Sequence, residues 1–199
     1  MEKKYKLTEE TINVGGTALY RIEALRDFGD VKKGDKGGFI EKEDNLSQSD
    51  NCWVYGNAKV CDKAMVYNNA KVYDNVMVFD NAMVYGNAKV YGNARVCDNV
   101  WVNCKVQVCG CAEVFGKAKI CGDAVITSNS DYIVFKNWWS SGRYFTWTKS
   151  NNMWKVGCFH GTGKELIEKA YKDSEISGRE YERVVKYVES IIADNGKDK

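Results

Sequence analysis

The sequence predicts a mainly β protein whose central part is a left-handed parallel β-helix of about five coils. Three observations lead to this prediction. A six-residue pattern repeats without an insertion from Val54 to Ile126, as in Val84-Tyr-Gly-Asn-Ala-Lys89. Gly, Asp or Asn usually occupies the third position of the pattern, and the chain contains no proline. A short fixed period is typical of solenoids, and proline-free strands suit a ladder in which the amides pair.

The pattern also predicts which side chains form the interior. An aliphatic residue such as Val78 opens each unit, and a small one such as Ala82 occupies the fifth position. We expect both to point inward, because a triangular coil is narrow near its corners. The residues at the third and fourth positions are expected to turn those corners in left-handed backbone conformations. Strands in such a stack lie about 4.8 Å apart, so five coils make a prism about 24 Å long.

Aromatic residues recur at the second position, which should face outward. Three units complete one coil, so residues 18 positions apart stack above one another. Two tyrosine columns result, one of Tyr55, Tyr73 and Tyr91 and one of Tyr67 and Tyr85. An exposed aromatic patch of this size often marks a contact surface, which predicts a homo-oligomer interface here. The alternative is that the stacked rings only stabilise the sheet.

The periodic pattern divides the chain into three parts. Residues 1–35 are expected to form an N-terminal cap of strands, with a tight turn at Val14-Gly-Gly-Thr17. The segment 34–38 reads as a glycine-rich loop that enters the first coil. Residues 36–127 form the β-helix, and residues 128–199 form a C-terminal α/β unit.

The C-terminal unit should contain three short strands followed by two helices. The strands are expected at Asp131–Phe135, Tyr144–Thr148 and Trp154–Phe159. Capping boxes at Thr162-Gly-Lys-Glu165 and Ser177-Gly-Arg-Glu180 predict the starts of the two helices.

Composition excludes several classes of protein. Lysine and arginine (29) nearly balance aspartate and glutamate (27), so we expect no strong attraction to DNA or to a membrane. No stretch resembles a signal peptide or a membrane-spanning helix. The eight cysteines lack the spacing of disulfides between coils, and Cys109-Gly-Cys111 has no second ligand pair for a metal. These features indicate a cytoplasmic protein with free thiols, no metal and no cofactor.

The C-terminal strands are rich in aromatic and cationic residues. Aromatic faces with cationic neighbours suit bases and phosphates. The alternative is that the aromatic residues form a small core, to which we assign Trp147. The candidate ligand-binding residues are Trp138, Trp139, Arg143, Tyr144, Lys149 and His160.

One part of the sequence carries a family resemblance. The motifs are Leu19-Tyr-Arg-Ile-Glu-Ala-Leu-Arg-Asp-Phe-Gly-Asp-Val-Lys-Lys-Gly-Asp-Lys-Gly-Gly-Phe-Ile40 and Asn51-Cys-Trp-Val-Tyr-Gly-Asn57. Over residues 4–126 the chain closely resembles the YdcK-like hexapeptide-repeat proteins of bacteria and their phages. That resemblance implies a β-helix of the acyltransferase superfamily, assembled as a homotrimer or else as a homodimer. The segment 156–161 resembles a tail common in phage-borne hexapeptide proteins.

The repeat contains no histidine, although hexapeptide acyltransferases generally use one as a general base. His160 lies outside the repeat and is expected to be a loop residue, and we predict no catalytic residue. We therefore predict a non-enzymatic oligomeric binding protein, encoded by a phage, that engages a host protein or a small nucleotide-like ligand. Inhibition of a host defence pathway is one form of that function. The alternatives are an acyl-CoA-dependent acyltransferase and a structural assembly module.

Overall fold

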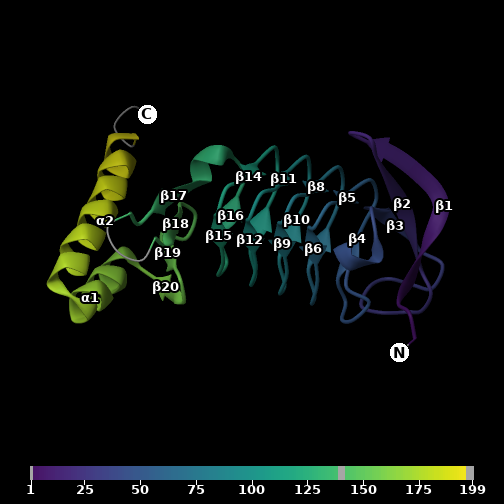
Figure 1. Cartoon of the computed structure of the whole chain (residues 1–199), viewed down its shortest axis with the longest axis horizontal. Helices are drawn as coiled ribbons and strands as arrows, with labels where there is room; N and C mark the ends of the chain where they lie inside the picture. The colour runs from purple at the N-terminus through teal and green to yellow at the C-terminus, as the bar shows by residue number, and fades with distance from the viewer. Residues whose placement is uncertain (1, 139–141, 196–199) are drawn as a thin grey trace.

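The structure is a computed structural model that describes residues 2–138 and 142–195. Figure 1 shows an elongated molecule in which an N-terminal hairpin, a stack of short strands, a small sheet and two helices follow one another along one axis. The predicted mainly β fold with a parallel β-helix is confirmed. No helix within these ranges is long and apolar enough to cross a membrane.

The N-terminal strands extend one face of the β-helix. Strands β1 (Tyr5–Val14) and β2 (Thr17–Ala24) form an antiparallel hairpin, and β2 pairs with β3 (Lys36–Ile40). The expected turn at Gly15 and Gly16 is present, and both residues have positive φ. The loop expected at 34–38 is partly wrong, because β3 starts within it and pairs in parallel with the first coil. A Cβ on Gly37 would lie 2.5 Å from a side-chain carbon of Ile22, so glycine is needed for this close approach.

The β-helix consists of two-residue strands arranged in three parallel sheets, one on each face of the prism. The sheets run in the orders β3-β5-β8-β11-β14, β4-β7-β10-β13-β16 and β6-β9-β12-β15. The strands are β4 (Trp53–Val54), β5 (Lys59–Val60), β6 (Met65–Val66), β7 (Lys71–Val72), β8 (Met77–Val78), β9 (Met83–Val84), β10 (Lys89–Val90), β11 (Arg95–Val96), β12 (Trp101–Val102), β13 (Gln107–Val108), β14 (Glu113–Val114), β15 (Lys119–Ile120) and β16 (Val125–Ile126).

The interior of the prism has the predicted register. First-position residues such as Val78 and fifth-position residues such as Ala82 are fully buried throughout the stack. Every third-position residue from Asp50 to Gly122 has positive φ, as predicted. The same expectation for the fourth position is wrong, because one left-handed residue is enough to turn each corner.

Aspartate at the third position has a second role. The backbone N–H of Asp80 donates to Oδ2 of Asp62 at 3.2 Å, and that of Asp98 donates to Oδ2 of Asp80 at 3.1 Å. The N–H of Gly116 then donates to Oδ2 of Asp98 at 2.7 Å. Each aspartate therefore accepts a hydrogen bond from the corner of the next coil, which fixes the stacking of this edge of the prism.

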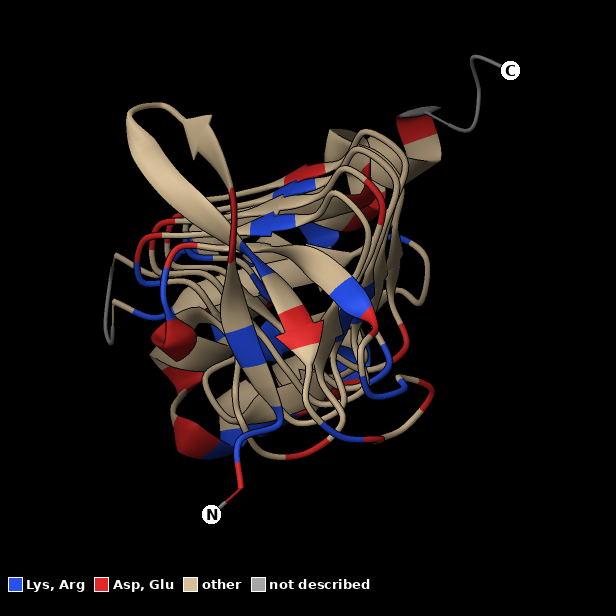
Figure 2. Ribbon diagram, turned by 90° about the vertical axis from the view of Figure 1, so that its right-hand side faces the viewer, with Lys and Arg blue, Asp and Glu red and all other residues tan. Residues whose placement is uncertain are grey.

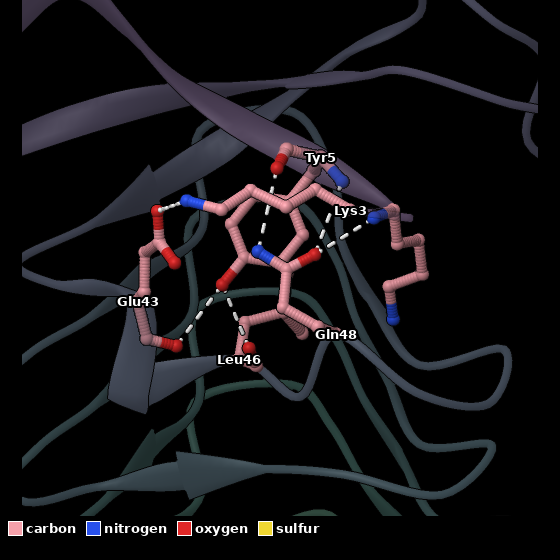
Figure 3. A network of polar contacts seen from close by, with 6 residues as sticks. Lys3, Tyr5, Glu43, Leu46 and Gln48 are labelled. Atoms are coloured by element: carbon pink, nitrogen blue, oxygen red, sulfur yellow. Dashed lines mark hydrogen bonds and ion pairs between the residues drawn. The ribbon is translucent and has the colours of Figure 1, made fainter. Parts of the chain in front are cut away.

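A polar network holds the hairpin on the first coil (Figure 3). The Tyr5 hydroxyl donates to the carbonyl oxygen of Leu46 at 2.7 Å, and Oε1 of Gln48 accepts the N–H of Lys4 at 2.8 Å. The fully buried Lys4 places its Nζ 2.9 Å from the carbonyl oxygen of Cys52. Burial lowers the pKa of Lys4 and raises that of the Cys52 thiol. This network closes the N-terminal end of the hydrophobic interior.

The C-terminal unit contains four strands instead of the three predicted. Strands β17 (Tyr132–Lys136), β18 (Tyr144–Thr148), β19 (Met153–Val156) and β20 (Phe159–Gly161) form an antiparallel sheet. The third predicted strand is split into β19 and β20, because Gly157 has a φ of 54° and turns the chain.

Two helices, α1 (Gly163–Asp173) and α2 (Glu175–Asn195), follow the sheet. Thr162 and Glu165 form the predicted capping box of α1. The predicted cap of α2 at Ser177 is wrong by three residues, because the helix starts at Glu175. The Ser174 hydroxyl accepts the backbone N–H of Ser177 at 3.1 Å, so Ser174 occupies the capping position.

The C-terminal sheet separates the helices from the end of the β-helix, because alternate residues of a strand face opposite sides. Phe145 and Trp147 of β18 pack in one cluster with Leu166 and Val185 of the helices. Thr146, between them, faces the last coil, where its Oγ1 accepts the backbone N–H of Lys119 at 2.9 Å. We call the sheet β17–β20 the lid.

Side chains of the lid and its adjoining turns also close the open strand edges of the last coil. An unpaired edge would otherwise invite pairing with another chain. The hydrogen bonds run from the N–H of Glu113 to Oδ1 of Asn129 (2.8 Å), from Phe115 to the Tyr132 hydroxyl (3.3 Å) and from Val125 to Oγ of Ser150 (2.8 Å).

Candidate functional site

The most promising site lies where the lid overhangs the sheet β6-β9-β12-β15. Two adjoining depressions share Trp101 and Lys119 from the sheet and Gly157 from the lid. Their volumes are about 340 Å³ for the one lined by Cys121 and about 380 Å³ for the one lined by Tyr144, both within the range of roughly 300–1,000 Å³ that is typical of ligand sites. We call the pair the groove.

The first depression combines cations with aromatic rings. Lys117, Arg143 and Tyr144 line it together with Trp101 and Lys119. The Nζ of Lys119 lies 3.9 Å from the centre of the Trp101 ring, and the Nζ of Lys117 lies 5.1 Å from that of Tyr144. These cation–π contacts position the ammonium groups and leave them able to bind an anion.

The second depression is lined by Tyr85, Asn103, Cys121, Lys155 and Cys158. The Nδ2 of Asn103 donates to the Tyr85 hydroxyl at 2.9 Å. The Oδ1 of Asn103 is buried and has no hydrogen-bond partner among the described residues. Leaving a buried acceptor unpaired costs about 1–3 kcal/mol, so a ligand N–H at this position would recover free energy.

Cys121 is not suited to act as a nucleophile. Burial raises the pKa of its thiol to about 11, and the nearby positive charge of Lys155 offsets only part of that increase. The thiol is therefore protonated near neutral pH, whereas the thiolate is the reactive form. A raised thiol pKa of this kind disfavours a role for Cys121 as a nucleophile.

His160 lies beside the second depression. It is the cross-strand neighbour of Lys155 in the lid, so both side chains are on the face directed at the last coil. A Cβ on Gly122 would lie 2.9 Å from the Cε1 of His160, so the glycine makes room for the imidazole. The next residue, Asp123, accepts a hydrogen bond from Nδ2 of Asn151 at 3.0 Å. That bond lowers the pKa of Asp123, and the charge of His160 contributes to the decrease.

The electrostatic character of the groove differs from that of the opposite end of the molecule. Figure 2, which shows that opposite N-terminal end from the front, has acidic and basic segments interspersed around the prism. The described residues that line the groove include Lys117, Lys119, Arg143 and Lys155 but no carboxylate. Such a concentration of cations attracts and holds an anionic ligand.

The structure brings together only part of the predicted ligand site. Arg143 and Tyr144 line the groove, and His160 lies at its rim. Trp138 is 83% exposed and does not line it. Lys149 lies beyond the opposite end of β18, and Trp139 lies outside the described residues. Ligand binding by these residues stays a prediction.

The assignment of Trp147 to the core is confirmed, since it is 3% exposed in the cluster between lid and helices. Trp154 is paired with it across the strands and is equally buried. The aromatic residues therefore divide between a core and the groove according to the face of the lid on which they lie.

Sequence reasoning missed Trp101, Lys119 and Asn103. One indication was available, because the second-position column that starts with Tyr67 and Tyr85 changes to Asn103 and then to Cys121. These departures from the repeat fall in the coils that line the groove.

The predicted tyrosine columns are stacked in part, with one pair of rings in contact in each. Tyr55 and Tyr73 stack with ring centres 4.5 Å apart, and Tyr67 and Tyr85 stack at 4.8 Å. The Tyr55 hydroxyl also donates to Asp30 at 2.8 Å, so part of this column contributes to contacts within the chain. Their burial between subunits stays a prediction.

All eight cysteines are free, and no group of three or more His, Cys, Asp or Glu residues in the described part of the chain could hold a metal ion.

No family model matches the chain. The chain is 41% identical over 61 residues to "Uncharacterized acetyltransferase YdcK" of Escherichia coli (strain K12), a match that covers 27% of this chain. The matched part is 19% of that relative, so the chain spans about a fifth of the length of the curated relative it matches. This similarity and the stacked coils together support the resemblance to hexapeptide-repeat β-helix proteins.

The prediction of a non-enzymatic binding protein is wrong, because the relative that the chain matches is named as an acetyltransferase, and this favours the acyltransferase alternative. His160, which is absent from the repeat, lies against the last coil at Gly122. Neither the comparison nor the fold supports a phage origin or a role against host defence.

Proposed function

We propose that the protein is an acyltransferase that takes an acyl group from acyl-CoA and transfers it to an amine or a hydroxyl group. The observation that carries this proposal is the groove, where four cations and several aromatic side chains converge beside His160. The similarity to a protein named as an acetyltransferase points to the same class of reaction.

In this proposal the first depression binds the nucleotide part of the donor. Lys117, Lys119 and Arg143 contact its phosphates, and the rings of Trp101 and Tyr144 pack against its base. Charge-assisted hydrogen bonds to phosphate are the strongest polar contacts that a site of this kind offers. The thioester then extends toward the second depression.

His160 acts as the general base. It takes the proton of the acceptor as the acceptor nitrogen or oxygen attacks the thioester carbonyl carbon. The C–S bond breaks, and the CoA thiolate leaves and is protonated. Asp123, held by Asn151, places a negative charge near the imidazolium that forms.

The groove cations should determine donor affinity. Replacing both Lys117 and Lys119 with Gln is expected to weaken binding of acetyl-CoA at least about tenfold, since hydrogen bonds to charged groups contribute about 1.5–3 kcal/mol each. Isothermal titration calorimetry measures the dissociation constant. The matched control is Lys89→Gln, an exposed lysine on another face of the prism. Equal affinity of the double variant and the control would contradict this placement of the donor.

We also propose that the chain forms a homo-oligomer, a trimer first and a dimer next, through the column of Tyr55, Tyr73 and Tyr91. Replacing all three with Ser should yield monomers in sedimentation velocity at micromolar concentration. The control is Phe115→Ser, an aromatic residue that is 50% exposed on a different face. A wild-type protein that sediments as a monomer would disprove this interface.

A further inference from the structure

The second depression contains polar groups that binding of the donor does not use. Lys155, Asn103 and Tyr85 line it, on the side of the groove where His160 lies. If the donor phosphates lie in the first depression, these groups face the acceptor. Their chemistry therefore restricts what the acceptor is.

Lys155 is placed to hold an anion beside the base. Lys155 and His160 are directly opposite each other on β19 and β20, and such pairs have Cβ atoms about 4.5–5.5 Å apart. No carboxylate is among the described residues that line this depression, so its ammonium has no acidic competitor there. An anionic group bound to Lys155 would place an amine a few bonds away within reach of His160.

Asn103 offers a hydrogen-bond acceptor for the amine end of the same ligand. Its Oδ1 is a buried acceptor without a partner, while its Nδ2 is engaged by the Tyr85 hydroxyl. Buried acceptors in native proteins are almost always paired, and an unpaired one at a site needs an explanation. An amine N–H of the acceptor, reached by a small rotation of the amide, provides that partner.

We infer that the acceptor is a small amine that carries an anionic group, a phosphate or a carboxylate, bound by Lys155 with its nitrogen between Asn103 and His160. This inference rests on the proposed acyl transfer. In the reaction the amine nitrogen forms a bond to the acyl carbon, the C–S bond of the thioester breaks, and the amine proton passes to His160. The products are the N-acyl anion and free CoA.

The test uses three amines with the same two-carbon spacing: ethanolamine, β-alanine and phosphoethanolamine. Turnover is measured with acetyl-CoA as the donor, by chromatographic separation of CoA, because the eight free thiols of the protein would react with a thiol reagent. Binding of each amine to the full chain is measured separately by calorimetry. The same measurements are made on Lys155→Gln and on Lys164→Gln, an exposed lysine of α1 that serves as the control.

We expect kcat/KM to be at least tenfold higher for one of the anionic amines than for ethanolamine. Comparing β-alanine with phosphoethanolamine shows which anion is preferred. In Lys155→Gln, kcat/KM for the preferred anionic amine should fall close to that for ethanolamine. Lys164→Gln should leave the difference between the two amines unchanged. The binding measurements separate this inference from the proposed function. If calorimetry shows tighter binding of an anionic amine than of ethanolamine, and Lys155→Gln loses it, the inference is supported; with no acetyl transfer detected, only the proposed function fails. Turnover without any preference for the anionic amines would overturn the inference alone, and absence of both binding and turnover would overturn both.

Discussion

The Val78→Asp variant is expected to lose cooperative folding. Val78 is fully buried in β8, where its rung neighbours are Val60 and Val96. An aspartate there would place an unpaired charge in an interior lined by valine and alanine, at a cost of several kcal/mol. That cost is comparable to the whole stability of a typical domain, about 5–15 kcal/mol. Thermal unfolding followed by circular dichroism measures the loss.

The adjacent residue provides the control. Met77 lies on the outer face of the same strand, between Lys59 and Arg95 on the neighbouring strands. Met77→Asp adds the same charge next to two cations, so the midpoint of unfolding should change by no more than a few degrees. If Val78→Asp unfolded at the same temperature as Met77→Asp, the inward register of the repeat would be refuted.

The His160→Asn variant is expected to lower kcat for acetyl transfer by about 10²–10⁴-fold, the usual contribution of a general base. Asparagine fits the space beside Gly122 but cannot take the proton. The affinity for acetyl-CoA should change little, because the cations assigned to the donor lie in the first depression. The side chain is exposed, so the unfolding midpoint should also be preserved.

An unchanged kcat in His160→Asn, with intact binding and folding, would place the base elsewhere in the groove. Asp123→Asn is the companion variant, because it removes the nearby carboxylate and keeps the hydrogen-bonding shape. A smaller loss of kcat than in His160→Asn is expected, since Asp123 acts on the acceptor only through the imidazole.

The β-helix could be predicted in detail because its determinants are local. Each six-residue unit carries its own inward valine and its own left-handed corner, and the same solution recurs in every coil. The corner prediction failed at the fourth position because composition alone does not distinguish a residue that needs positive φ from its neighbour that tolerates it.

The C-terminal unit could be predicted only as a set of elements. Its strands and the cap of α1 have local patterns, but the split after Val156 depends on Gly157 adopting a left-handed conformation. Whether Tyr144 or Trp147 is part of the core depends on which face of the lid meets the helices, and tertiary packing decides this.

The groove itself is not encoded in any one motif. Trp101 comes from the β-helix and Gly157 from the lid, and they become neighbours only when the lid closes the last coil. The repeat contains no histidine, yet the fold places His160 from the lid against Gly122 of the last coil. The chemistry of His160 depends on the residues that surround it in space, and the sequence on either side of it does not specify them.

Acetyl transfer by the wild-type protein tests the proposed function most directly. The protein is incubated with acetyl-CoA and a panel of small amines, amino sugars and alcohols, and CoA and the acetylated product are measured by chromatography with mass detection. We predict that CoA forms at a rate that depends on the acceptor, and that this rate falls in His160→Asn. CoA release that is no faster with the protein than without it, for every acceptor, would contradict the assignment of this groove as an acyltransferase site.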